Sequence, residues 1–186
     1  MLENPKLLSV IIETVGGRHW DHILNYFKNG GLVVYFGIIG EYAAPKKLSD
    51  SFALDWTFSA YTRHEYELTS VGKEILGEAL TTVEYSKANL LKVPESDRIL
   101  VPKHPYDSLE DLVRDEIDGR QKDDDEVMDE GRVQYAAMRE ELNKQALLVM
   151  HEADHGGRIA YLGFVNGNIP KFVKAICMGA RTSSMS

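Results

Sequence analysis

Apolar side chains recur along most of the chain at steps of three and four residues, which is the spacing of one face of an α-helix. The pattern predicts helices over residues 5–28 with a break at 16–17, from about 51 to 93 with an interruption near 69–72, over 108–117, from about 131 to 162, and over 172–178. The apolar run 32–39 lies between glycines, and periodicity does not decide whether it is a strand or a helix. We therefore expect an all-α fold, with a short extended segment near residues 32–39 as the open alternative.

Length and composition fit one domain over residues 1–186, and 44% hydrophobic residues are enough for a core. The 29 acidic and 21 basic residues give a net charge of −8, which argues against nucleic acid as a partner. The single cysteine, Cys177, excludes an intrachain disulfide, and the N-terminus lacks the form of a signal peptide. No apolar run reaches the roughly 20 residues of a membrane span. We expect a cytoplasmic protein without a membrane partner.

Two histidines four residues apart, His151 and His155, lie on the apolar stripe of the predicted last helix. That spacing brings two imidazoles to one face of a helix, where both can reach one metal ion. The stretch also matches the H-E-x-x-H pattern of zinc hydrolases, in which the glutamate, here Glu152, is the general base. No His, Asp or Glu follows His155, so the usual third ligand of such enzymes is missing. Two interior histidines satisfied by hydrogen bonds are the competing interpretation.

A third ligand is available from the helix predicted to begin near residue 51. Its core-facing positions recur at steps of four, namely Phe52, Trp56, Ala60, His64 and Leu68. Facing helices of a bundle can build a metal site in their shared core. Three histidines leave a coordination position open for water or substrate, and imidazoles suit Zn, Ni and Fe alike.

Residues 151–162 resemble the last-helix motif of the DinB-like metal proteins, which commonly reads H-x-x-x-H-R-G-Q-I-x-x-L. The interval of eight residues from Trp56 to His64 and the segment Ser108–Leu112 are also similar to earlier parts of that family. The resemblance covers about residues 50–170, whereas residues 1–50 match poorly. It implies a DinB-like four-helix bundle with a divalent metal ion held by three histidines.

The resemblance implies a metal-dependent thiol S-transferase or hydrolase whose small-molecule substrate includes a low-molecular-weight thiol. His64, His151 and His155 would bind the metal, Glu152 would transfer a proton, and Arg158 would hold an anionic substrate. The alternative is a non-catalytic stress-related or interaction bundle with a structural or vestigial metal site. An H-E-x-x-H zinc hydrolase is the lesser alternative, and a homodimer stays open.

Two further stretches bear on the fold. Val15-Gly16-Gly17 together with the run 32–39 resembles part of the nucleotide-binding half of medium-chain quinone reductases. No G-x-G-x-x-G loop precedes that run, and such a fold needs several more β-α units. The segment 94–106 is interrupted by prolines and predicts a connection in which Ile99–Val101 is briefly extended.

Overall fold

The computed structural model describes residues 10–12, 17–36, 43–77, 82–104, 124–164 and 169–182. Its elements are β1 (Val10–Ile12), α1 (Trp20–Lys28), β2 (Leu32–Phe36), α2 (Ala43–Phe52), β3 (Thr57–Leu68), α3 (Ser70–Leu76), β4 (Thr82–Lys92), the 3-10 turn η2 (Glu95–Asp97), β5 (Arg98–Pro102), α5 (Asp124–Asn143), β6 (Gln145–Ala146), β7 (Leu148–Glu152), β8 (Arg158–Leu162) and α6 (Ile169–Thr182). The strands form one mixed sheet in the order β1-β2-β8-β7-β5-β3-β4-β6. The fold is therefore α/β, and both the all-α prediction and the expected DinB-like four-helix bundle are wrong.

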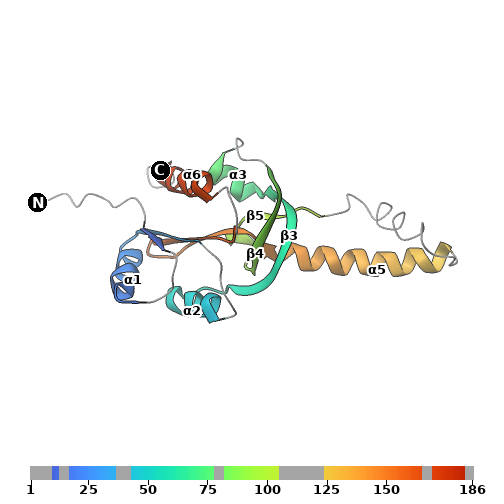
Figure 1. The fold of residues 1–186 in the computed structure, drawn as a ribbon, viewed down its shortest axis with the longest axis horizontal. Helices are drawn as coiled ribbons and strands as arrows, with labels where there is room; N and C mark the ends of the chain where they lie inside the picture. The colour runs from blue at the N-terminus through green and yellow to red at the C-terminus, as the bar shows by residue number, and fades with distance from the viewer. Residues whose placement is uncertain are drawn as a thin grey trace, which may run out of the picture.

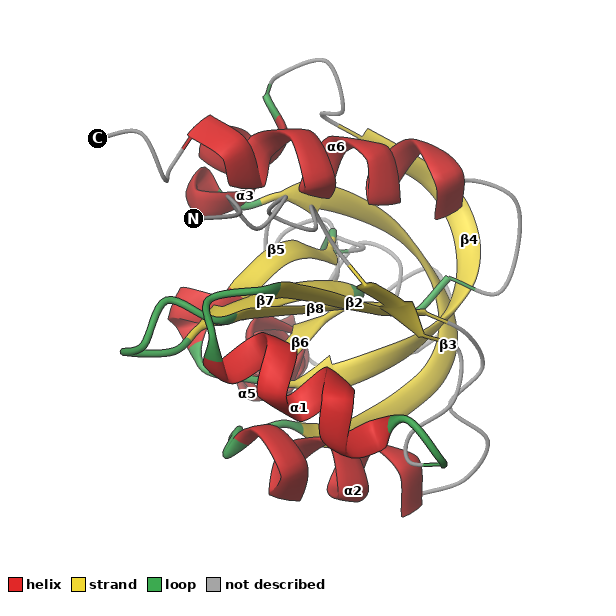
Figure 2. Ribbon diagram, turned by 90° about the vertical axis from the view of Figure 1, so that its left-hand side faces the viewer, coloured by secondary structure: helices red, strands yellow, loops and turns green. Residues whose placement is uncertain are grey.

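The sheet is covered by helices on both faces, with α3 and α6 on one side and α1 and α2 on the other (Figure 2). Side chains alternate between two buried clusters along each central strand. In β2, Leu32 and Val34 belong to the cluster under α3 and α6, whereas Val33 and Tyr35 belong to the cluster under α1 and α2. Burial on both faces explains why β2 is a continuous apolar run rather than an alternating one.

One edge of the sheet is parallel. β1 pairs with β2, and β2 pairs with β8, both in parallel register. The chain passes from β1 to β2 through α1, whose buried Phe27 packs into the cluster under α1 and α2. The apolar run 32–39, for which the sequence did not decide between a strand and a helix, contains β2 over residues 32–36.

The rest of the sheet is antiparallel and curls back on itself. β6 and β7 follow each other directly and form one interrupted strand. β6 pairs with β4, whereas β7 pairs with β5 and β8. Gly163, directly after β8, completes the closure: its carbonyl accepts from the Asn89 N–H of β4, and its N–H donates to the Leu147 carbonyl, both at 2.9 Å. The curvature brings segments that are distant in sequence to one end of the molecule.

The helix predicted from about residue 51 to 93 is replaced by α2, β3, α3 and β4. A step of four is also two repeats of the two-residue period of a strand, so Ala60, His64 and Leu68 lie on one face of β3 instead, whereas Phe52 ends α2 and Trp56 directly precedes β3. Threonine and aromatic residues are frequent in β3, and these side chains favour strands. The expected helical position of His64 is therefore wrong.

The helix predicted from about residue 131 to 162 ends at Asn143, where α5 ends. The residues that follow form β6 and the β7–β8 hairpin, whose turn contains Gly156 at φ +81°. Glycine adopts this conformation without strain, which favours the reversal of the chain. The helix predicted over 108–117 lies outside the described residues, and the one over 172–178 lies within α6.

α5 is the one helix drawn extending well away from the sheet, with its C-terminal end against the β-strands (Figure 1). Its last turn is tied to β4 by an ion pair between Lys92 and Glu141, in which Nζ and Oε1 are 2.6 Å apart. Among the described residues, no helix is long and apolar enough to cross a lipid bilayer.

We expect Gly163→Ala to destabilise the protein. A Cβ atom at residue 163 would lie 1.9 Å from the Asn89 carbonyl oxygen, and this backbone atom can move only if the β4–β8 closure opens. The free energy of unfolding should fall by about 1–3 kcal/mol, as expected for overpacking. Urea denaturation measures the change, and an unchanged midpoint would contradict the close approach.

Candidate functional site

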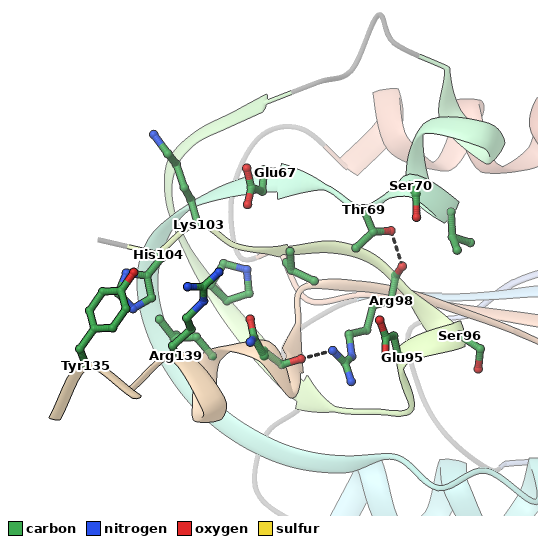
Figure 3. Close-up of a pocket in the computed structure, with 15 residues that line it drawn as sticks. Glu67, Thr69, Ser70, Glu95, Ser96, Arg98, Lys103, His104, Tyr135 and Arg139 are labelled. Atoms are coloured by element: carbon green, nitrogen blue, oxygen red, sulfur yellow. Dashed lines mark hydrogen bonds between the residues drawn. The ribbon is translucent and has the colours of Figure 1, made fainter. Parts of the chain in front are cut away.

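A pocket of about 460 Å³ lies between the C-terminal half of α5, the adjoining ends of β3 and β5, the start of α3 and η2. Figure 3 shows Tyr135 and Arg139 of α5 on one side and Glu95 and Ser96 of η2 on the other. The volume lies within the range of small-molecule sites, about 300–1,000 Å³.

Two guanidinium groups line this pocket from different elements. Arg98, on β5, donates from Nε to the Val93 carbonyl at 3.3 Å and from Nη1 to the Asn143 carbonyl, which holds it between the sheet and the end of α5. Arg139 projects from α5. Within the described part of the chain, neither arginine forms an ion pair with a carboxylate. Their positive charges are therefore available to an anion.

The remaining charges of the pocket nearly balance. Lys103 pairs with Glu65, which lies 3.8 Å away, and both side chains are exposed. Glu67 and Glu95 also line the pocket. The lining thus holds three cations and two carboxylates, and Glu65, the partner of Lys103, brings the charges to equal numbers in a chain whose net charge is −8.

An aromatic wall closes one side of the pocket. The rings of His104 and Tyr135 have centroids 4.8 Å apart and are inclined at 64°. The guanidinium carbon of Arg139 lies 6.0 Å from the centroid of the Tyr135 ring. Both rings are half-buried and line the pocket, which gives it planar apolar surface beside a cation.

Hydroxyl groups line the opposite side. Thr69 caps α3 by accepting from the Gly72 N–H at 3.0 Å, and its own hydroxyl donates to the Arg98 carbonyl at 2.6 Å. This bond fixes the start of α3 to β5 (Figure 3). Ser70 adds an exposed hydroxyl that can donate to a ligand, whereas the Ser96 hydroxyl donates to Asp97 and offers a ligand only its oxygen as an acceptor.

Behind this pocket lies a buried carboxylate. Asp97 is the last residue of η2 and is only 5% exposed. It accepts from Trp56 Nε1 at 2.8 Å and from the Ser96 hydroxyl at 3.1 Å, and both of its oxygens lie 3.2 Å from His151 Nδ1. The 3-10 turn η2 therefore presents Ser96 to the pocket and Asp97 to His151.

The structure separates the three histidines predicted to share a metal ion. His64 lies on β3, where its Nε2 is 3.5 Å from the Thr62 hydroxyl. His151 is bound to Asp97, and β5 lies between its strand and β3 in the sheet. His155 lies in the β7–β8 turn, where its ring contacts Phe27 edge to face at 4.8 Å.

In the described residues, no three His, Cys, Asp or Glu side chains are placed to hold a metal ion together. A spacing of four residues brings two imidazoles together on a helix, but here a strand and a turn carry them. The prediction of a metal-binding four-helix bundle with zinc or nickel is therefore wrong. Glu152 is exposed at the end of β7 and is paired in register with Arg158 of β8. The roles predicted for these two residues stay predictions.

Sequence reasoning missed Asp97, Arg98, Tyr135 and Arg139. Asp97 lies in the proline-interrupted segment that predicted only a connection, although the extended segment predicted at Ile99–Val101 is confirmed as part of β5. Trp56 was expected in a core, and an indole that deep needs an acceptor for its N–H. That requirement is the one signal that could have pointed to a buried carboxylate.

Comparison with models of protein families and with curated proteins finds no match to this chain.

We expect His64 to make stability depend on pH. Burial lowers the pKa of His64 from its ordinary value of 6.5, so the unfolded chain takes up this proton at a higher pH than the folded protein does. The free energy of unfolding should therefore fall as the pH decreases through 6.5 and below. Urea unfolding between pH 8 and pH 5 measures this slope. His64→Gln should give a shallower slope, and equal slopes would contradict the assignment.

Trp56→Phe should lower the free energy of unfolding by about 2 kcal/mol, because it removes a hydrogen bond to a buried charged acceptor. Trp20→Phe is the matched control, since Trp20 Nε1 donates to the uncharged Ser51 hydroxyl at 3.3 Å in a partly exposed position. Urea denaturation compares the two variants. Equal losses would show that the Asp97 carboxylate adds nothing to the Trp56 bond.

Proposed function

We propose that the protein binds a small organic anion with a planar ring, such as an aromatic carboxylate, in the pocket between α5 and the sheet. The observation that supports this proposal is the pair Arg98 and Arg139, which lack a carboxylate partner among the described residues. Guanidinium groups bind carboxylates through two parallel hydrogen bonds, so the arginines suit the charged end of such a ligand.

The aromatic wall suits the other end. Tyr135 and His104 offer ring surface next to Arg139, and a planar ligand can pack against these rings while its anionic group meets the guanidinium. The exposed hydroxyl of Ser70 can donate to a further oxygen atom of the ligand. The pocket thus combines apolar surface with a few polar groups, as ligand sites commonly do.

The charge balance favours a ligand with a single negative charge. Glu67 and Glu95 line the same pocket, and their carboxylates repel a polyanion. This argument separates a monoanion from a polyphosphate or a nucleic-acid backbone, which need a larger surplus of cations.

Calorimetric titration with benzoate and cyclohexanecarboxylate tests the proposal. The two probes carry the same charge, and only benzoate is planar, so we expect benzoate to bind more tightly. Tyr135→Leu should remove this preference. Equal binding of both probes to the wild-type protein would contradict the role of the aromatic wall.

Arg139→Met should weaken benzoate binding about tenfold or more, the effect of losing one hydrogen bond to a charged group. Arg132→Met is the matched control, because Arg132 lies on the same helix and is not part of the pocket lining. The same titration compares both variants. A similar loss in both would attribute binding to the general charge of α5 rather than to the pocket.

A further inference from the structure

His151 is held by a buried carboxylate and still reaches the surface. Its side chain is 32% exposed, whereas that of Asp97 is 7% exposed. Both Asp97 oxygens lie 3.2 Å from Nδ1, so the ring is fixed by this one atom. Trp56 and Ser96 donate to the same carboxylate, which keeps it in place when the imidazole changes its charge.

The carboxylate also determines which nitrogen of the neutral imidazole is basic. An ionised carboxylate only accepts hydrogen bonds, so Nδ1 carries the proton and Nε2 carries the lone pair. Among the described residues, no group forms a hydrogen bond with Nε2 of His151. An oriented, partly exposed imidazole with an open Nε2 is the arrangement of a general base.

We propose that His151, oriented by Asp97, is the general base of a second site that hydrolyses small uncharged carboxylic esters. This activity goes beyond anion binding in the pocket and does not depend on it. The two sites adjoin η2, whose Ser96 lines the pocket while Asp97 holds the imidazole.

The charges around His151 favour an uncharged substrate. Asp97 faces the ring from η2, and Asp154 is exposed in the turn after β7, whereas the Glu152 side chain points to the opposite face of the sheet from His151. Arg158 of β8 is paired in register with Glu152, and His155 lies in the turn between β7 and β8. The Asp97 carboxylate against the ring and the exposed Asp154 of the same hairpin repel an anionic substrate.

The reaction needs only water as co-reactant. Nε2 takes a proton from water as the water oxygen forms a bond to the ester carbonyl carbon, and the carbonyl π electrons move to its oxygen. The tetrahedral intermediate collapses when the bond to the alcohol oxygen breaks. That oxygen leaves with the electron pair and takes the proton from the imidazolium Nε2. The products are a carboxylic acid and an alcohol, and the imidazole is again neutral.

Hydrolysis of 4-nitrophenyl acetate by the full chain tests this proposal. We expect His151→Gln to lower the rate about 100-fold or more, within the usual range for general-base catalysis. His155→Gln is the matched control: it removes another imidazole of the same hairpin, and the rate should not change. Equal rates for wild type and His151→Gln would overturn the proposal, as would an equal loss in His155→Gln.

Two further measurements separate catalysis from a structural role. The wild-type rate should decrease in D₂O, because a proton moves in the slow step. Accumulation of acetylated protein without slowing in D₂O would instead make His151 a nucleophile and overturn the general-base role. The anionic ester 4-nitrophenyl hemisuccinate should react more slowly than the acetate, and Asp97→Asn should lower the acetate rate even when its thermal unfolding shows a folded protein.

Discussion

The arrangement of the curled sheet depends on the hydrogen bonds that the Asp97 carboxylate accepts. A buried charge costs several kcal/mol unless hydrogen bonds compensate it, so every donor to Asp97 is constrained. Those donors come from three separate places: Trp56 at the start of β3, Ser96 within η2 and His151 near the end of β7. Ser49 of α2 extends the network by donating to the Trp56 carbonyl at 2.6 Å. One carboxylate thus fixes a helix, two strands and a turn relative to one another.

The closure of the sheet then places the candidate site. β3 and β4 are long and antiparallel, and irregularities in their pairing near Phe58 and His64 accompany the bend. β5 lies between β3 and β7, so its ends meet both the start of α3 and the end of α5. The pocket forms where these elements converge, and its lining residues come from three separate segments of the sequence, 67–71, 95–104 and 135–143.

Local patterns in the sequence identify some elements and misassign others for a physical reason. The apolar stripe of Trp20 and Phe27 predicts α1, and the apolar run that begins at Leu32 allows β2 as one of two interpretations. Both elements can be read from the sequence because they depend on residues that are close in the chain. Steps of four around His64 fit a helix and a strand equally well, so the choice rests on pairing with β4 and β5, which no local pattern contains. The resemblance to the DinB-like proteins depends on spacings of four and eight residues, which fit a helix and a strand alike. Asp97 and Arg139 reach their sites only after the sheet has curled, and apart from the need of the Trp56 indole for an acceptor, the sequence offers no signal for them.

The position of α5 has a consequence for how the protein responds to a ligand. One wall of the pocket belongs to this helix and the opposite wall to the sheet, and the helix extends beyond the sheet (Figure 1). A molecule that contacts both walls stabilises one orientation of α5 over others, and thermodynamic linkage requires the reverse as well. Loss of the packing of α5 against the sheet would in turn remove one wall of the pocket together with its contacts to the ligand.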